Sequence, residues 1–254
     1  MPIRLARVED ESTIAALCAA AFWKEDCFCR VVLPKHEEFP DDVKIFWHEW
    51  LRADWQERGK VILAAVVGEE QPDARKIIGV AVWQRKGNDE HARKVHDEWI
   101  DPGKPGTMHG KLFFVDYVGP HAFLPLEPTH NRALDPATAN ILQEAEPYIA
   151  HHFEGIYANS WYLHLLAVHP AFQYRGFGRE LIEWGLEKAR EEGVHASVIS
   201  SDSKEPFYFA CGFDSIVGSM TDGKGNPLGL RNMRGGAIMF MWRACSPEAL
   251  EHSS

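Results

Sequence analysis

Two glycines, Gly176 and Gly178, stand one residue apart in "FQYRGFGREL" (172–181), where a strongly apolar run gives way to a helical pattern. Glycine leaves room for a ligand to approach the backbone, and it tolerates a positive φ. The helix expected from about Arg179 begins with unpaired N–H groups and the positive end of its dipole. Together these features predict an anion site suited to a diphosphate. The alternative is a tight strand-to-helix turn that needs glycine for its backbone alone.

Two other phosphate-binding motifs do not fit this stretch. A P-loop needs G-x-x-x-x-G-K-[ST], and the sequence contains no such run. A dinucleotide fingerprint needs a third glycine three residues after Gly178, where Leu181 stands. That fingerprint also opens its domain, whereas this turn lies beyond residue 170. The sequence therefore disfavours a nicotinamide- or ATP-dependent enzyme.

The elements on both sides of the turn follow from their apolar patterns. The run "WYLHLLAV" (161–168) predicts a strand, and "GRELIEWGLEKAREEG" (178–193) predicts a helix. Alternation along the strand predicts one sheet face formed by Tyr162, His164, Leu166 and Val168. The opposite face is then formed by Leu163, Leu165 and Ala167. The helix should bury the face that carries Leu181, Ile182, Gly185, Leu186 and Ala189.

The remaining pattern predicts an α/β fold. The first 85 residues predict a short strand, an alanine-rich helix (9–22), a helix over 40–59 and a hairpin of "VILAAVVG" and "KIIGVAVWQR". Residues 24–40, rich in proline and charge, predict a loop. From residue 160 the order is strand–helix–strand–helix–strand–strand, which is typical of a mixed sheet layered with helices.

Residues 86–159 form a long connection between these two regions. The pattern there is looser, with two candidate helices, "DEHARKVHDEWI" and "ATANILQEAEPYIAHHF", and one candidate strand, "GKLFFVDYVG". Connections of this length inside one domain are unusual, and many are lids or binding surfaces. We therefore predict an insertion that binds substrate; the alternative is a peripheral segment without a role.

Composition narrows the classes of function. The 254 residues are 45% apolar and 25% charged, which is typical of a globular protein that buries a sizeable core. A net charge of −10 disfavours nucleic-acid binding and permits attraction of an amine. We expect no secretory signal, no membrane span, no metal site and a cytoplasmic location. The five cysteines are odd in number and irregularly spaced, so we expect reduced thiols.

The motifs around the glycine turn resemble the GNAT superfamily of N-acetyltransferases. "QYRGFG" (173–178) matches the coenzyme A loop [QR]-x-x-G-x-[GA] of that family at every fixed position. A strand ending in "LAVHP" precedes the turn, and "FYFACGF" (207–213) follows at the usual distance and resembles the family's "FY…GF". The resemblance covers about residues 160–215 well and the flanking elements loosely. It implies acetyl-CoA as co-substrate and a GNAT fold.

The resemblance also implies the architecture and the coenzyme contacts. We expect one domain over 1–254, with a mostly antiparallel sheet of about seven strands flanked by helices. It contains an 86–159 insertion and a 160–215 acetyl-CoA-binding core. In the parent fold the coenzyme-binding strand splays from its neighbour, and its backbone bonds the pantetheine amides. The implied cofactor-binding residues are Leu166, Ala167, Val168, Gln173, Tyr174, Arg175, Gly176, Phe177, Gly178, Arg179 and Ser201.

Direct attack of an amine on the thioester, as in this family, requires a group that donates a proton to the leaving thiolate. The resemblance assigns this role to Tyr208, four residues before Gly212, because a phenol stays protonated at neutral pH. The alternative is a core aromatic on a short helix, since Tyr208 lies between Phe207 and Phe209.

The base that accepts the ammonium proton is less directly implied. Many family members carry a glutamate where Tyr162 stands, so this chain lacks the simplest candidate. The arylalkylamine N-acetyltransferase branch, which "HLLAVH" resembles, uses a histidine on this strand. We predict His164 as the base, acting directly or through water, with Asp116 in reserve. His169 precedes a proline and is expected to belong to the turn.

These residues predict an acetyl-CoA-dependent N-acetyltransferase that acts on a primary amine of a small molecule, as a monomer or homodimer. The alternatives are a protein-lysine or O-acetyltransferase of the same fold, or a CoA-binding sensor or interaction module that has lost turnover. Aromatic residues that would suit an apolar acceptor, or equally a core, are Trp99, Phe113, Phe114, Tyr117, Phe123, Tyr148 and Trp161.

Overall fold

Seven strands form one sheet in the part of the chain that the computed structural model describes, residues 3–68, 76–97 and 130–242. The strands follow the order β1 (Ile3–Leu5), β2 (Lys60–Val67), β3 (Lys76–Lys86), β4 (Ser160–Val168), β5 (His195–Ile199), β7 (Ala237–Met241) and β6 (Ser215–Ser219). Every neighbouring pair is antiparallel except β4 and β5, which are parallel. This mixed, mostly antiparallel sheet confirms the predicted fold class.

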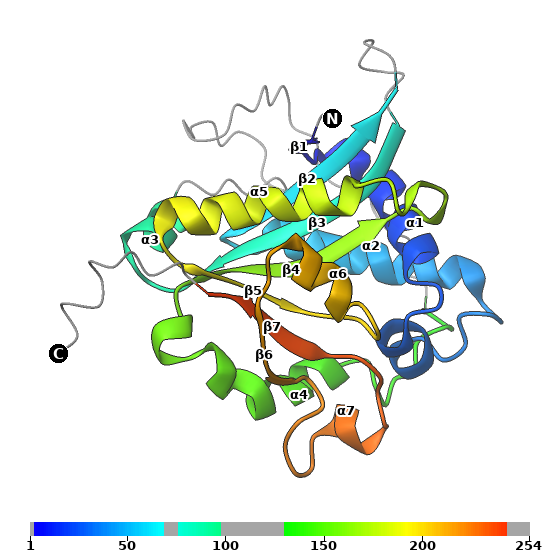
Figure 1. Ribbon diagram of the computed structural model, residues 1–254. Coiled ribbons are helices and arrows are strands. Elements are labelled where there is room, and N and C mark those ends of the chain that lie inside the picture. Colours follow the sequence, from blue (N-terminus) through cyan, green and yellow to red (C-terminus); the bar gives the residue numbers. More distant parts are fainter. Residues whose placement is uncertain (1–2, 69–75, 98–129, 243–254) are drawn as a thin grey trace.

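Helices cover both faces of this sheet (Figure 1). On one face lie α1 (Glu11–Ala21) and α2 (Pro40–Gln56). The same face also carries α4 (Ile141–Ile149) and α7 (Pro227–Leu230), and these two helices contact each other. On the opposite face lie α5 (Phe177–Glu192) and α6 (Glu205–Cys211). A further short helix, α3 (Glu90–Asp97), follows β3. The sheet therefore separates two apolar cores, one under α1 and α2 and one under α5.

Residues 24–40, predicted as a loop, contain a helical segment at Asp26–Val32. The Glu25 carboxylate accepts a hydrogen bond from the Phe28 N–H at 2.9 Å, and Arg30 forms an ion pair with Asp26 at 2.7 Å. The prediction was wrong here because seven residues are too few to establish a helical period.

The coenzyme-binding strand predicted around residue 164 contains a β-bulge. Leu163 pairs with Trp83 of β3, and Leu165 pairs with the next residue, Val82, so His164 has no partner on that strand. One extra residue in a strand reverses the facing of every residue beyond it.

The bulge corrects the strand faces predicted from alternation. Leu165 and Ala167 belong to the core under α1 and α2, whereas Leu166 and Val168 pack towards the core under α5. His164 lies on the side of α2. Strict alternation was therefore wrong beyond His164, because the apolar residues 165–168 fit either face equally well.

The parallel pair β4 and β5 separates towards the glycine turn. Pairing runs from Ser160 opposite His195 to Leu163 opposite Val198, and it ends there. β4 continues to Val168, so the side of β4 that faces β5 is unpaired over 164–168. This is the splayed strand that the sequence motifs predict, and its free backbone groups face an opening in the sheet.

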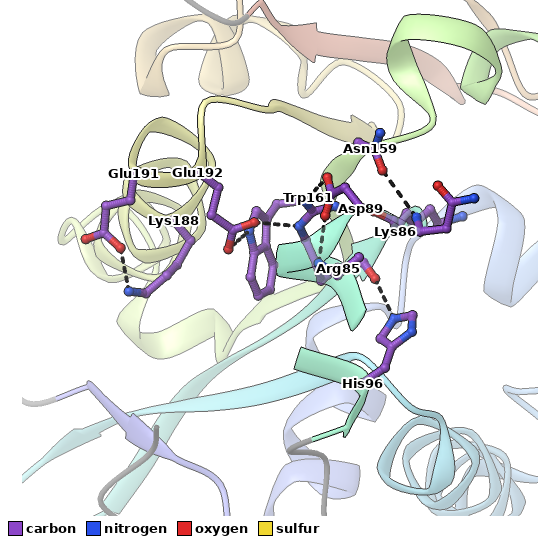
Figure 2. Close-up of polar contacts among 11 residues, drawn as sticks. Arg85, Lys86, Asp89, His96, Asn159, Trp161, Lys188, Glu191 and Glu192 are labelled. Atoms are coloured by element: carbon purple, nitrogen blue, oxygen red, sulfur yellow. Dashed lines mark hydrogen bonds and ion pairs between the residues drawn. The ribbon is translucent and has the colours of Figure 1, made fainter. Parts of the chain in front are cut away.

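The two ends of the 86–159 segment meet beside the end of β3 (Figure 2). Arg85 is completely buried, and its guanidinium binds Asp89 at 2.6 Å and Glu192 of α5 at 2.6 Å. The Asn159 side chain accepts a hydrogen bond from the Asn88 N–H at 3.2 Å. Arg85 therefore joins the start of the insertion to α5, the helix that follows the glycine turn.

We expect Gly185→Ala to lower the free energy of unfolding by about 1–3 kcal/mol. A Cβ at Gly185 of α5 would lie 2.2 Å from the Trp83 ring, which is fully buried and donates a hydrogen bond to the Leu181 carbonyl at 3.1 Å. Elsewhere in a helix the same change stabilises by about 1 kcal/mol. Urea unfolding of this variant and of Glu187→Ala, an exposed position on α5, measures the difference. A Gly185→Ala protein as stable as the parent would show that Trp83 can move aside.

Candidate active site

Gly176 immediately precedes α5 with a φ of +90° and a ψ of −12°. An added Cβ there would meet no atom within 4 Å, so the space above the backbone is open. At Gly178 an added Cβ would lie 3.2 Å from the Phe207 ring of α6, so this glycine permits a close approach of the two helices. The first turn of α5 thus presents its N–H groups to an open space, which is the anion-binding geometry that the sequence predicts.

Other side chains of the predicted turn have different surroundings. Tyr174 adopts a φ of +62° and is fully exposed, and the Arg175 guanidinium lies 5.4 Å from the Phe172 ring centre. Gln173 donates a hydrogen bond to the Val168 carbonyl at 3.1 Å, which fastens the turn to the end of β4. Phe177 packs into the core under α5, so only its backbone is available to a ligand.

A cavity of about 1130 Å³ begins where β4 and β5 separate. Its walls come from β4, the end of β5, α2, α6, the 26–32 helical segment and residues 139–158 of the insertion. Pocket volumes of several hundred Å³ or more are typical of small-molecule sites. The described part of the insertion therefore forms one wall of the cavity. Predicted site residues that border the cavity are His164, Leu166, Ser201 and Tyr208.

Tyr208 lies on α6 at the edge of this cavity and is 8% exposed. Its ring makes edge contacts with the rings of Phe207 and Phe213, and no described residue hydrogen-bonds its hydroxyl. Burial raises the pKa of the Tyr208 phenol above its usual value, with smaller contributions from neighbouring groups. The hydroxyl therefore stays protonated at neutral pH and is able to donate a proton.

His164 is held by an aspartate that the sequence patterns did not single out. Its Nε2 lies 3.2 Å from Oδ1 of Asp54, on α2, and the Trp50 ring stacks on the imidazole at 5.5 Å between centres. The same carboxylate binds the Lys60 ammonium at 2.6 Å. Asp54 is 3% exposed and Lys60 is 5% exposed, so this is a buried network in the cavity wall.

The charge of Asp54 depends on these two partners. Burial alone would raise the pKa of its carboxyl, but the hydrogen bond and charge of His164 and the charge of Lys60 outweigh burial and lower it. An ionised Asp54 fixes the orientation of the imidazole. No sequence signal identified Asp54, because one aspartate near the end of an amphipathic helix ordinarily reads as a solvated residue.

Two further residues modify the predicted site. Tyr162, at the position of the family's glutamate, borders the cavity, and burial raises the pKa of its phenol. Ser201, after the end of β5, borders the cavity with Glu25, and burial raises the pKa of the Glu25 carboxyl. Glu25 comes from the segment before Asp26–Val32, so one wall of the site lies in the region predicted as a loop.

Some predicted candidates lie elsewhere. The Trp161 indole donates a hydrogen bond to Glu192 at 3.0 Å and packs in the core under α5, which is the core alternative given for it above. Tyr148 lies against Gly223 rather than in the cavity wall. His169 accepts a hydrogen bond from the Ala171 N–H within the turn, as predicted. The remaining candidates fall outside the described residues: Trp99, Phe113, Phe114, Asp116, Tyr117 and Phe123.

No cluster of three or more histidine, cysteine, aspartate or glutamate side chains suited to a metal ion occurs among the described residues. None of the helices in the described ranges has the length and apolar character needed to cross a membrane.

The glycine turn, β4, β5 and α6 lie within a region that matches a known family. Residues 120–228 match the family described as "Acetyltransferase (GNAT) domain". A protein named "Acetyltransferase" from Stachybotrys chartarum is 24% identical over 220 residues, which cover 86% of this chain and 82% of that protein.

A solved structure has a similar fold. The structure described as histone acetyltransferase HPA2 and related acetyltransferase from Corynebacterium glutamicum aligns with a TM-score of 0.51 and 15% identity, over 96% of this chain and 97% of that chain. A mosquito arylalkylamine N-acetyltransferase-like 5b aligns with a TM-score of 0.49 and 12% identity, over 94% of this chain and 97% of that chain.

The family match and the curated relative indicate the class of protein: an acetyltransferase. Residues 120–228 match a GNAT acetyltransferase domain, the family that the turn and helix motifs resemble. Enzymes of this family take their acetyl group from acetyl-CoA.

Proposed function

We propose that this protein transfers the acetyl group of acetyl-CoA to a primary amine of a small molecule. The observation that carries the proposal is the continuity of the site. The open helix N-terminus at Gly176 is followed by the unpaired edge of β4, and this edge leads into the cavity where Tyr208 and His164 lie. A diphosphate, an extended pantetheine arm and a thioester would occupy these three places in turn.

The residues of this chain perform two proton transfers in the proposed reaction. Acetyl-CoA supplies an activated acyl carbon, which the amine attacks directly in a ternary complex. His164, oriented by Asp54, removes the proton that the amine must lose. Tyr208, protonated at neutral pH, gives a proton to the departing sulfur. Backbone N–H groups on the unpaired side of β4 are the candidate partners of the acyl oxygen and the pantetheine amides.

The coenzyme contacts are proposed residue by residue. Gly176, Phe177, Gly178 and Arg179 offer backbone N–H groups to the pyrophosphate, with side-chain assistance from Arg175 and Arg179. Leu166, Ala167 and Val168 contact the pantetheine arm through their backbone, and Ser201 through its hydroxyl. Gln173 and Tyr174 shape the turn. We further propose one domain over 1–254 and a cytoplasmic monomer or homodimer.

A small-molecule acceptor is favoured by the shape of the site. The cavity lies beneath residues 139–158 of the insertion and is bordered by the aromatic side chains of Phe22, Phe28, Phe46, Trp50, Phe153 and Tyr162. Several carboxylates border it as well, among them Glu49, Glu57 and Glu146. This combination suits an amine with an apolar body and a protonated nitrogen.

Thermal unfolding with acetyl-CoA, NAD and ATP added separately tests the coenzyme site. Acetyl-CoA at about 100 times its dissociation constant should stabilise the fold by about 2.7 kcal/mol and raise Tm by about 5–10 °C, while NAD and ATP should not. Gly176→Glu should abolish this shift, because it places a carboxylate at the anion site.

Gly155→Glu is the matched control for this experiment. Gly155 also has a positive φ, +62°, and an added Cβ there would also meet nothing within 4 Å, but it does not border the cavity. Both variants therefore place a glutamate at a positive φ, where the backbone is strained. An acetyl-CoA shift that both variants lose, or that neither loses, would contradict pyrophosphate binding at the turn.

A further inference from the structure

Two lysines border the cavity, and their surroundings differ. The Lys60 ammonium binds Asp54 at 2.6 Å and Glu57 at 2.7 Å. The Lys86 ammonium has no hydrogen bond or ion pair to any described residue. It lies 4.7 Å from the Tyr162 ring centre and 5.4 Å from the Phe153 ring centre instead. One cavity lysine is thus held by two carboxylates, and the other has no carboxylate partner among the described residues.

Burial of the unpaired ammonium favours the neutral amine of Lys86. Burial lowers its pKa, assisted by the charge of Lys60 and opposed by the charges of Glu146 and Glu57. The nucleophile in acyl transfer is the free amine, and lysines become nucleophilic when desolvated in this way. Lys86 therefore has the chemistry of the acceptor that this class of enzyme uses.

Lys86 also lies next to the proposed base. Lys86 is opposite Ser160 at the start of β4, and its side chain reaches the ring of Tyr162 further along that strand. The Tyr162 ring centre is 5.8 Å from that of His164. The Tyr162 ring therefore lies next to both the Lys86 nitrogen and the His164 imidazole. The flexible side chain of Lys86 has room to move within the cavity of about 1130 Å³.

We propose that this enzyme acetylates its own Lys86 from acetyl-CoA, using the cavity in which small-molecule amines are acetylated. The inference rests on the proposed function of this site. The neutral Nζ attacks the thioester carbon, a C–N bond forms and the C–S bond breaks. Nζ gives one proton to His164, and the sulfur receives one from Tyr208, so the products are Nζ-acetyl-Lys86 and free coenzyme A.

The modification would change the cavity in two ways. It removes the basic amine of the one described cavity lysine that no carboxylate pairs, and it places an amide against Phe153 and Tyr162. The acetylated side chain would then occupy part of the space into which an acceptor amine binds. Saturating acceptor amine should accordingly slow the modification.

The test is peptide mass spectrometry of the full-length protein after incubation with deuterium-labelled acetyl-CoA and no amine. The isotope separates new acetyl groups from any acquired during expression. We expect one labelled acetyl group on Lys86, none on Lys60 and none at position 86 in Lys86→Arg. Tyr208→Phe should slow labelling by about 100-fold, whereas spontaneous acetylation of surface lysines should be unchanged.

Calorimetric titration of acetyl-CoA and an amine assay on the same protein separate the possible failures. If the protein binds acetyl-CoA and acetylates amines but leaves Lys86 unlabelled, the inference is wrong and the proposed function stands. The inference is also wrong if label spreads over exposed lysines equally in the parent and in Lys86→Arg. If acetyl-CoA does not bind, the proposed function fails and takes the inference with it. The main measurement, labelling of Lys86, is made on the protein without any substitution, so it does not depend on whether a variant folds.

Discussion

Tyr208→Phe is expected to lower kcat by about 100-fold or more while leaving the KM for acetyl-CoA nearly unchanged. The substitution removes one hydroxyl and keeps the ring contacts with Phe207 and Phe213, so the core under α5 is preserved. Without this group the sulfur must leave as a thiolate or find a proton in water. The measurement is amine-dependent release of free coenzyme A thiol at saturating acetyl-CoA.

Tyr157→Phe provides the matched control for the loss of a phenol. Tyr157 packs against His195, Phe240 and Trp242 and does not border the cavity. Its substitution should leave kcat within about twofold of the parent value. A Tyr208→Phe enzyme with full activity would show that Tyr208 is a core aromatic and that another group protonates the sulfur.

Asp54→Asn is expected to lower kcat by about 10–100-fold. The ionised carboxylate orients the His164 imidazole, and an uncharged amide at this position would hold the ring less firmly. Asp41→Asn, an exposed carboxylate on the same helix, should leave kcat unchanged. An unchanged kcat in Asp54→Asn would mean that an imidazole held by Asp54 is not the base.

The pH dependence of the stability of Asp54→Asn tests the contacts of this carboxylate separately. Because the pKa of Asp54 is lower in the folded protein, its ionised form stabilises the fold at pH values above its unfolded pKa of about 3.9. That contribution is lost as the pH falls through the folded pKa. Asp54→Asn should therefore lower the free energy of unfolding by about 3 kcal/mol near neutral pH, because it leaves Lys60 with one carboxylate instead of two. Under strongly acidic conditions the loss should be much smaller.

The fold was predictable largely because each strand and helix carries its own period of apolar residues. Gly193 ends α5 with a φ of +62°, and the buried face of that helix includes every residue that its apolar pattern assigned to it. The glycine turn was predictable for a similar reason: a positive φ at Gly176 and a close approach at Gly178 are requirements that glycine alone meets easily.

The details of the active site were less accessible from sequence because they depend on contacts between distant residues. The bulge at His164 changes no residue type, so the apolar run 165–168 gives no sign of it. The pairing of His164 with Asp54 joins α2 to β4 across 110 residues of sequence. The contrast between Lys60 and Lys86 likewise appears only when the cavity is formed.

A crystal structure of the protein with acetyl-CoA would test the central claim most directly. We expect the pyrophosphate on the N–H groups of 176–179, the pantetheine arm along 166–168 and the thioester sulfur within hydrogen-bond distance of the Tyr208 hydroxyl. The acetyl group should then point into the cavity towards His164. Coenzyme bound elsewhere, or a thioester remote from both Tyr208 and His164, would contradict the account.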